Sequence, residues 1–412
     1  MTIGGRVAEA ASPKRLAWAM SGVFFGYFFH VGIFTPYWPL WLGAEGASAE
    51  SIGAIIALTM VARTLGQPLF SYLADHLGRA RVLLWSALAG ALLLLTMPLL
   101  SGLHAIAWVA VLATFCLAPL VPVSDALTVS DNRLHYGRVR LWGSVGFICA
   151  NVLVGMAIAQ WGTALIVPLG ALSLLLVVAF AFLLPRDAPA SVPSVPQMSG
   201  AQRRALLRAT LRHPALWWLM GAAALINGSH GFYYAFVTKY WRETMGFDAT
   251  WIGFLWATGV VAEIAVLAWL GGRKSHRAGL IFMAAASGAA VVRWLLMAQS
   301  PPLGLIFLLQ SFHALSFGAW QLGSVQLLRR MAPADVSTSV MGVQSALAGG
   351  VAMAGAIWLG GKLYGLWPEA GFYLSAAMAA LGGLLLWIFA KTWRQAAHQA
   401  IEPHENAFGD DR

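Results

Sequence analysis

Two stretches of this chain can be aligned with each other across a spacing of 200 residues: HVGIFTPYWPLWLGAEGASAESIGAIIALTMVAR at 30–63 and HGFYYAFVTKYWRETMGFDATWIGFLWATGVVAE at 230–263. They align without a gap and are identical at nine of 34 positions. Such self-similarity at a fixed spacing indicates an internal duplication. The two stretches end in Arg63 and Glu263, so equivalent positions carry opposite charges.

The composition around this duplication is that of a membrane protein. Of the 412 residues, 59% are hydrophobic and 10% are charged, and the mean hydropathy is +0.72. About a quarter of the residues of a soluble domain are charged, so the soluble classes are excluded. A membrane-spanning helix uses about 20 apolar residues, and the chain has room for twelve. The predicted spans are 16–42, 51–72, 82–100, 104–126, 140–160, 163–184, 214–240, 250–271, 277–298, 302–325, 338–362 and 370–390.

The basic residues predict the orientation of these spans. Of the 26 Lys and Arg residues, 21 fall at the N-terminus, in the even-numbered loops or in the tail, and three fall on the opposite side. Because cytoplasmic loops are rich in Lys and Arg, both termini are predicted to be cytoplasmic, in a plasma membrane such as a bacterial inner membrane. The net charge of +10 then reflects topology and does not indicate a nucleic-acid partner.

One long connection divides the predicted spans into two groups of six. It is rich in Pro and Ser and ends in a basic run. We therefore expect an all-α membrane protein made of two six-helix pseudo-repeats, an arrangement in which substrate binds near the midplane between the halves. The predicted parts are a cytoplasmic N-terminus at 1–15, a bundle at 16–184, a linker at 185–213, a second bundle at 214–391 and a cytoplasmic tail at 392–412.

The loop after the second predicted span reads LADHLGRAR at 73–81. It resembles the signature of the major facilitator superfamily, in which an Asp and a Gly-Arg-x-Arg run link helix ends and act in gating. The sequence departs from that signature at Ser71, where the family usually has glycine. The resemblance implies a gating role for Asp75, Gly78, Arg79 and Arg81.

A closer resemblance covers nearly the whole chain. The chain is similar to the phenylpropionate permease branch of that superfamily, which is allied to the oligosaccharide:proton (lactose permease-like) symporters. This resemblance implies a secondary transporter that takes up a small organic solute, an aromatic carboxylate or a sugar, together with protons. The similar segments are GIF at 32–34, VAR at 61–63, PLVP at 119–122, GRVRLWGS at 137–144, VVAE at 260–263, VRW at 292–294 and His313.

Ionisable residues at membrane depth are the candidates for proton coupling, because each costs about 2.5–3.5 kcal/mol on insertion scales. Burial disfavours the charged form of a carboxyl group and a nearby cation favours it, so Glu263 beside Arg293 could load and release a proton. The alternative is a static ion pair between the two helices. Lactose-type symporters have an acid on helix eight, an Arg on helix nine and a His twenty residues after that Arg, and this chain resembles them with Glu263, Arg293 and His313. Those symporters also have a carboxylate three residues after the His, where this chain has Ser316. A hydrogen-bonded, uncoupled His313 remains an equal alternative.

A second group resembles residues that contact the sugar in those symporters: Asp125, Arg140 and Phe147, although the loop between the first two is shorter here and Phe147 stands where that family has Trp. Asp125 is also a candidate for proton coupling. Arg140 could instead pair with an aromatic acid or anchor the helix at the membrane surface. Arg63 could bind an anionic substrate or lock its helix to a carboxylate. The remaining predicted lining residues are His30, His230, Tyr234 and Asn227.

The sequence also excludes several chemistries. No His, Cys or carboxylate cluster has metal spacing, and no phosphate-binding glycine loop is present, so no metal, cofactor or ATP drive is expected. Cys116 and Cys149 lie in apolar runs and are expected to be packed as small residues. The expected partners are the solute, protons and the lipid bilayer, with no obligate protein partner. An exporter and an uncoupled facilitator remain alternatives, whereas a membrane-embedded enzyme lacks a catalytic constellation.

Four tryptophans are expected to anchor the helices at the membrane interface, where indole rings are enriched. They are Trp38, Trp41, Trp241 and Trp251.

Overall fold

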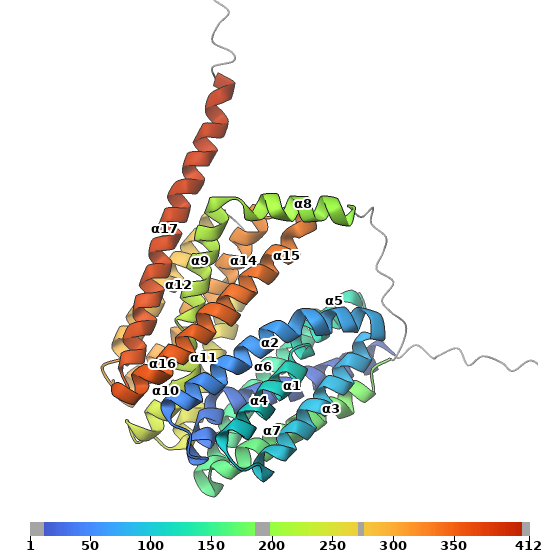
Figure 1. The fold of residues 1–412 in the computed structure, drawn as a ribbon, viewed down its shortest axis with the longest axis vertical. Helices are drawn as coiled ribbons and strands as arrows, with labels where there is room; N and C mark the ends of the chain where they lie inside the picture. The colour runs from blue at the N-terminus through green and yellow to red at the C-terminus, as the bar shows by residue number, and fades with distance from the viewer. Residues whose placement is uncertain (1–11, 186–197, 271–275, 406–412) are drawn as a thin grey trace, which may run out of the picture. The chain divides into compact units, whose positions relative to one another are not determined.

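The computed structural model describes residues 12–185, 198–270 and 276–405. The secondary structure within these ranges is helical throughout, as predicted (Figure 1). The predicted N-terminus 1–15, linker 185–213 and tail 392–412 extend into residues outside this description. Contacts divide the chain into two units, and the division into six-helix halves at the linker stays a prediction. Unit 1 is Met1–Pro193 with Ala235–Ala257, and unit 2 is Ser194–Tyr234 with Thr258–Arg412.

The first part of the chain folds into long helices that belong to unit 1. Gly78 ends α2 and begins α3 with a φ of +96°, a conformation that glycine adopts without strain. The helices are α1 (Pro13–Ala44), α2 (Ala49–Leu77), α3 (Arg79–Thr96), η1 (Met97–Leu99), α4 (Leu103–Leu117), α5 (Leu120–Ser130), α6 (Tyr136–Trp161), η2 (Thr163–Leu165) and α7 (Ile166–Phe182).

The second part of the chain contains more interrupted helices. Two segments, η3 and η4, are π-helical, and α10 and α11 each contribute residues to both units. The helices are α8 (Gly200–Leu211), α9 (Pro214–Gly228), α10 (Gly231–Glu243), α11 (Ala249–Leu270), α12 (His276–Met297), α13 (Leu303–Ser311), η3 (Ala314–Ala319), α14 (Trp320–Met331), α15 (Ala334–Ser345), η4 (Ala346–Met353), α16 (Ala354–Leu366) and α17 (Ala370–Glu405).

The number of candidate spans differs from the predicted twelve. Eleven described helical segments are long and apolar enough to cross a membrane. The predicted span 214–240 is absent from these because it forms two shorter helices, α9 and α10, which meet at Ser229 and His230. Hydropathy alone does not reveal this break, because apolar runs continue beyond it on both sides, but Asn227-Gly228 and Gly231 beside it are helix-breaking residues.

In unit 1, α1 packs closely against α6 and α7. The close approach depends on small residues: a Cβ atom placed on Gly32 would lie 2.8 Å from both the Cβ of Ala150 and the carbonyl oxygen of Phe147. A ridge of stacked rings on α1 fills the space beside this contact. The ring of Trp38 stacks on Phe34 at 5.1 Å and on Trp41 at 4.9 Å between centroids.

This packing corrects the prediction for three of the four tryptophans. Trp38, Trp41 and Trp241 are 5%, 3% and 0% exposed, so they are core residues and not interface anchors. Only Trp251, which is 45% exposed, is placed as an anchor would be. Large rings at helical spacing fill the gaps between packed helices, and sequence periodicity does not distinguish that role from anchoring.

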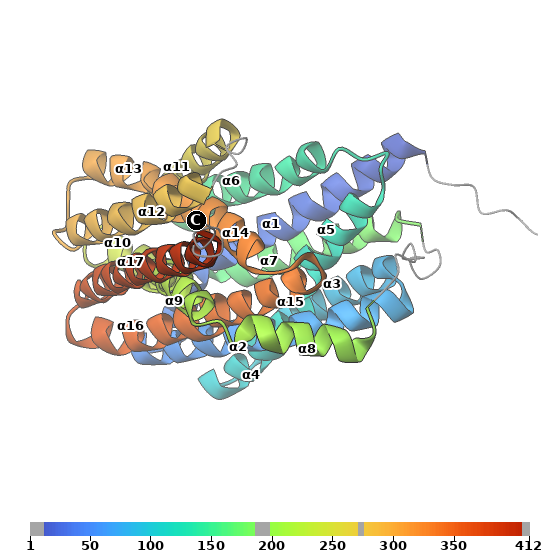
Figure 2. The same ribbon diagram turned by 90° about the horizontal axis from the view of Figure 1, so that it is seen from above.

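In unit 2, the helices surround one apolar core cluster. α17 packs against both α9 and α12, and Figure 2 shows these three helices together. Apolar side chains of α9, α12, α14, α15 and α17 fill the space between them, including Leu219, Met283 and Phe389, each 0–1% exposed. Cys116 and Cys149, both in unit 1, are half-buried free thiols.

We expect Gly32→Ala to destabilise the protein, because the new methyl group meets backbone of α6 that cannot move aside cheaply. Overpacking of this kind typically costs about 1–3 kcal/mol. The measurement is thermal unfolding of the purified protein in detergent. The matched control is Gly304→Ala in α13, where an added Cβ has nothing within 4 Å among the described residues. Equal melting temperatures for the two variants would contradict the close approach.

Candidate functional site

Two groups of polar side chains lie in the predicted spans, one in each unit. The group in unit 2 surrounds a buried arginine and is called the arginine cluster here. Its members come from α10, α11, α12, α13 and η3, together with two histidines that directly precede α10 and η3. They are His230, Tyr233, Glu263, Arg293, Gln310, His313 and Ser316.

Local backbone irregularities position several of these side chains. His230 lies in the break between α9 and α10, directly before α10 begins at Gly231. The π-helical segment η3 begins directly after His313, and π-helical turns inside α-helices are frequent at functional sites. Gln310, His313 and Ser316 are spaced by three residues and are 0%, 7% and 0% exposed, so they point into the interior of unit 2.

Arg293 of α12 is the centre of the cluster and is 0% exposed. Its Nη1 donates to Nδ1 of His313 at 3.1 Å and to Oγ of Ser316 at 3.4 Å, and its Nη2 donates to Oε1 of Gln310 at 2.7 Å. The guanidinium carbon also lies 4.5 Å from the centroids of two rings, Tyr233 and Trp294. Hydrogen bonds and cation–π contacts therefore replace water around the buried charge.

The contact with Arg293 determines the tautomer of His313. An arginine can only donate, so Nδ1 of His313 must accept and carries no proton. In the neutral imidazole, the proton then resides on Nε2. That nitrogen lies 3.7 Å from Oε2 of Glu263 on α11. His313 therefore presents an N–H to the carboxylate on one side and a lone pair to the guanidinium on the other.

Glu263 lies at the more accessible end of this chain of contacts. Its side chain is 20% exposed, compared with 9% for the side chain of His313. The prediction that Arg293 is its natural partner is refined by this geometry, since His313 lies between the carboxylate and the guanidinium. The arrangement can pass an electrostatic change at Glu263 to Arg293 through one imidazole ring.

A second branch of the cluster runs from Arg293 to His230. Nε2 of His230 lies 3.1 Å from Oγ of Ser316, and the same oxygen accepts from Arg293. His230 is 0% exposed, and its Nδ1 lies 3.2 Å from the carbonyl oxygen of Ile226. Ser316, which stands where the lactose-type symporters have a carboxylate, therefore connects the histidine to the buried arginine.

The aromatic wall of the cluster is held by hydrogen bonds as well as by packing. Nε2 of Gln310 donates to the hydroxyl of Tyr233 at 2.7 Å, and Nε1 of Trp294 donates to Oγ of Ser229 at 3.3 Å. Gln310 thus bridges the arginine and the tyrosine that covers it. These bonds fix the rings over the guanidinium and leave little freedom for its rotation.

The second polar group, in unit 1, joins the middle of α5 to the start of α6. Oδ1 of Asp125 accepts from the hydroxyl of Tyr136 at 3.1 Å and lies 4.0 Å from Nε of Arg140. The side chains of Asp125 and Arg140 are 34% and 30% exposed, so the pair is only half-buried. This Asp125–Arg140 pair lies in a different unit from the arginine cluster, whereas the sequence analysis grouped Asp125 with Glu263 for proton coupling.

Arg140 is also surrounded by aromatic rings of α1. Its guanidinium carbon lies 4.1 Å from the centroid of Phe28 and 5.4 Å from that of Phe24. Phe147 follows Arg140 by two helical turns of α6 and is half-buried. The rings and the half-exposed guanidinium together offer an apolar face and a cation to a ring-bearing anion.

The predicted gating residues link three helices of unit 1. Nη2 of Arg79 donates to Oδ1 of Asp75 at 3.5 Å, and its Nη1 donates to Oγ of Ser130 at 3.4 Å and to the carbonyl oxygen of Ala126 at 3.5 Å. Arg79 therefore holds the end of α2 to the last turn of α5, where a cation is favoured by the helix dipole.

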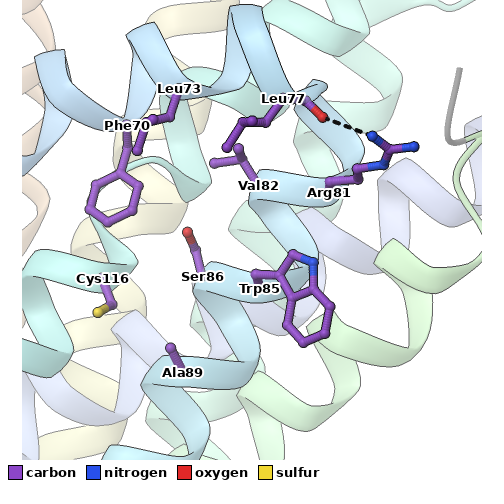
Figure 3. Close-up of a pocket in the computed structure, with 9 residues that line it drawn as sticks. All are labelled: Phe70, Leu73, Leu77, Arg81, Val82, Trp85, Ser86, Ala89 and Cys116. Carbon is purple, nitrogen blue, oxygen red and sulfur yellow. Dashed lines mark hydrogen bonds between the residues drawn. The ribbon is translucent and has the colours of Figure 1, made fainter. Parts of the chain in front are cut away.

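Arg81, two residues after Arg79 on α3, lies at the rim of a cavity. Its Nη1 donates to the carbonyl oxygen of Leu77 at 3.5 Å. The cavity has a volume of about 420 Å³ and is walled mostly by apolar side chains of α2, α3 and α4, including Phe70, Trp85 and Cys116 (Figure 3). Polar groups that could recognise a solute are sparse on these walls, so we do not assign the cavity to substrate.

The other predicted residues lie apart from these contacts or at their edges. Nδ1 of His30 lies 3.3 Å from the carbonyl oxygen of Gly170, and its ring stacks on Phe34 at 4.5 Å, as a packed core histidine would. Tyr234 lines the arginine cluster, with its ring 6.1 Å from that of His230. Asn227 is buried in the last turn of α9.

Arg63, near the middle of α2, is half-buried. No hydrogen bond or ion pair of its side chain is found within the described ranges 12–185, 198–270 and 276–405. The predicted lock to a carboxylate therefore has no support in that part of the chain. Within the same ranges, no group of three His, Cys, Asp or Glu side chains is placed to hold a metal ion.

Two members of the arginine cluster were not predicted as site residues: Gln310 and Ser316. The signal that was available is their spacing. Gln310 and Ser316 are the polar residues three positions before and after His313, so they share its helix face. A polar pair flanking an intramembrane histidine at that spacing indicates a shared network.

Comparison with known proteins identifies the family. The model of the MFS_1 like family matches residues 17–374. A curated protein named "Probable 3-phenylpropionic acid transporter" from Escherichia coli (strain K12) is 30% identical over 365 residues, which is 86% of this chain and 93% of that protein. "Maltose permease" of Geobacillus stearothermophilus is 30% identical over 390 residues, which is 91% of this chain and 95% of that protein.

Solved structures support the same fold. A crystal structure of a mutant of the nucleoside transporter NupG has a TM-score of 0.79 with 15% sequence identity, and the alignment covers 91% of this chain and 99% of that one. Identity at this level shows the fold alone. Together with the family match and the helical spans, it leads to one assignment: this chain is a multi-pass membrane transporter of the MFS_1 like family, in the major facilitator superfamily, and not an enzyme.

Proposed function

We propose that this transporter takes up a small organic solute, an aromatic carboxylate or a sugar, together with protons, by alternating access. The observation that carries the proposal is the chain of contacts from Glu263 through His313 to Arg293. A partly accessible carboxylate joined to a buried cation through a neutral imidazole can exchange a proton and alter the electrostatics of the interior. A ligand and a proton that bind the two states unequally are sufficient to drive the cycle.

Solute recognition is assigned to the Asp125–Arg140 pair and the rings beside it. A half-exposed guanidinium over Phe28 can bind a carboxylate, while the ring faces pack against an aromatic ring. The name of the E. coli relative supports an aromatic acid, and the name of the Geobacillus relative supports a sugar. We favour the acid, because the arginine is lined by phenylalanines.

The membrane topology is part of the proposal. We assign the twelfth crossing to α9 and α10 together, since the two helices continue through Ser229 and His230 with an apolar sequence on both sides. The excess of Lys and Arg on one side of the predicted spans supports cytoplasmic termini in a bacterial inner membrane. Two six-helix bundles at 16–184 and 214–391 are also part of the proposal, because the internal duplication and the long linker divide the predicted spans into two groups of six.

Glu263→Gln is expected to abolish accumulation driven by a pH gradient, because glutamine cannot bind and release a proton. Exchange of solute already present on both sides should continue. The measurement is radiolabelled uptake into proteoliposomes with and without an imposed gradient, over a panel of aromatic acids, disaccharides and nucleosides. The matched control is Glu45→Gln, which removes an exposed carboxylate at the end of α1.

Uphill uptake at the wild-type rate in the Glu263→Gln protein would remove this residue from the coupling mechanism. The direction of flux in the same vesicles separates uptake from export. Equal uptake by the wild-type protein with and without the pH gradient would instead indicate an uncoupled facilitator.

Arg140→Ala is expected to weaken binding of an aromatic acid by about 10- to 100-fold, since a hydrogen bond to a charged group contributes about 1.5–3 kcal/mol. The measurement is the dissociation constant of the acid and of its uncharged amide. The amide should be less affected, because it forms no ion pair. Arg138→Ala is the control, as this neighbouring arginine is exposed. If Arg140→Ala bound the acid with wild-type affinity, Arg140 would not take part in binding and would only anchor its helix at the membrane surface.

A further inference from the structure

A short helix before α9 has two different faces. α8 begins at Ser199 with a capping box, in which Oγ of Ser199 accepts from the backbone N–H of Gln202 and the Gln202 side chain accepts from the N–H of Ser199. Leu207 and Leu211 pack against the apolar core cluster of unit 2. Figure 1 shows α8 lying across the ends of α9 and α15. The helix is therefore a fixed part of unit 2.

The other face of α8 is strongly basic. Arg204, Arg208 and Arg212 recur every four residues and form one row, with Arg203 beside them, and all four are exposed. The sequence contains no Asp or Glu between Asp187 and Glu243. Within the described ranges, none of the four arginines forms an ion pair. Among the described residues, the row therefore presents positive charge that no carboxylate pairs with.

A cavity adjoins the end of this row. It has a volume of about 450 Å³ and is lined by Arg212 and Pro214 of the α8–α9 junction, Trp217 and Trp218 of α9, and Leu385 of α17. Its apolar wall is held in place, because Nε1 of Trp217 donates to the carbonyl oxygen of Leu211 at 2.7 Å. Trp218 is 38% exposed. One cation thus stands at the rim of an indole and aliphatic wall.

We propose that this cavity is a binding site for an anionic phospholipid of the surrounding leaflet. The phosphate group would bind Arg212 and the adjacent arginine row, and the upper part of an acyl chain would lie against Trp218 and Leu385. Basic pockets beside membrane helices bind anionic head groups, and tryptophan is enriched at the depth where head group and chain meet. The site would attach α8 and the start of α9 to the membrane surface.

The walls of the cavity favour a lipid over a free phosphate. A soluble anion could use the arginines but would leave the two indole rings and Leu385 uncovered. A phospholipid supplies both chemistries in one molecule, with the charge at the rim and the hydrocarbon against the wall. This assignment does not depend on which solute is transported, so it stands or fails separately from the proposed function.

The test is native mass spectrometry of the full-length protein in detergent, titrated with phosphatidylglycerol or with phosphatidylcholine of the same acyl chains. We expect tighter binding of phosphatidylglycerol, because its head group carries a net negative charge. Arg212→Gln should weaken that binding by about fivefold, the effect of one basic residue at an anionic membrane surface. Trp218→Ala should weaken binding of both lipids. The control variant is Arg138→Gln, which removes an exposed arginine of unit 1.

Two further outcomes are decisive. Equal binding of phosphatidylglycerol to the wild-type and Arg212→Gln proteins would overturn the site. Complete displacement of the lipid by millimolar inorganic phosphate or glycerol phosphate would also overturn it, since a site for the head group alone does not need the indole wall. Retention of the bound lipid against both soluble anions supports the proposal. Size-exclusion profiles that match wild type exclude misfolding as the cause of any loss.

Discussion

The structure of unit 2 is constrained by one charge, the guanidinium of Arg293. On insertion scales, an arginine at membrane depth costs about 2.5–3.5 kcal/mol, and this one is fully removed from solvent. The cost is offset by Gln310, His313 and Ser316 as acceptors and by two aromatic faces. None of these three acceptors is a carboxylate, and His313, which accepts from Arg293, also lies 3.7 Å from Oε2 of Glu263.

The fold was predictable where the physics of the bilayer is simple. Long apolar windows and their flanking arginines indicate an all-helical membrane protein, and the family match and the eleven candidate spans bear this out. The predicted span 214–240 missed the break at Ser229 and His230, although Asn227-Gly228 and Gly231 flank it and are helix-breaking residues; in the structure His230 contacts Ser316 and Ser229 contacts Trp294 there. Trp38 and Trp41 were misplaced because whether a ring fills a core or faces the interface depends on neighbouring helices.

The candidate site was predictable in its charged members and not in its neutral ones. Glu263, Arg293 and His313 stand out because ionisable residues are expensive in a membrane. Gln310 and Ser316 carry no charge, so the cost of burying an ionisable group did not point to them, and Ser316 stood out only as the replacement of a carboxylate. The order of contacts was also hidden, since only the side-chain directions place His313 between the acid and the arginine. Asp125 lies with Arg140 in the other unit. The sequence alone does not show that Asp125 is apart from Glu263, Arg293 and His313.

The charge count of the arginine cluster has an electrical consequence. With His313 neutral, Arg293 and an ionised Glu263 sum to zero, and one proton on Glu263 leaves a single positive charge. Joint movement of that proton with a monovalent aromatic anion would then transfer no net charge across the bilayer, so uptake would be indifferent to voltage. Joint movement with an uncharged sugar would transfer one elementary charge, worth about 2.3 kcal/mol per 100 mV of membrane potential. Uptake of the acid would therefore draw on the pH gradient alone, whereas uptake of the sugar would draw on both the pH gradient and the membrane potential.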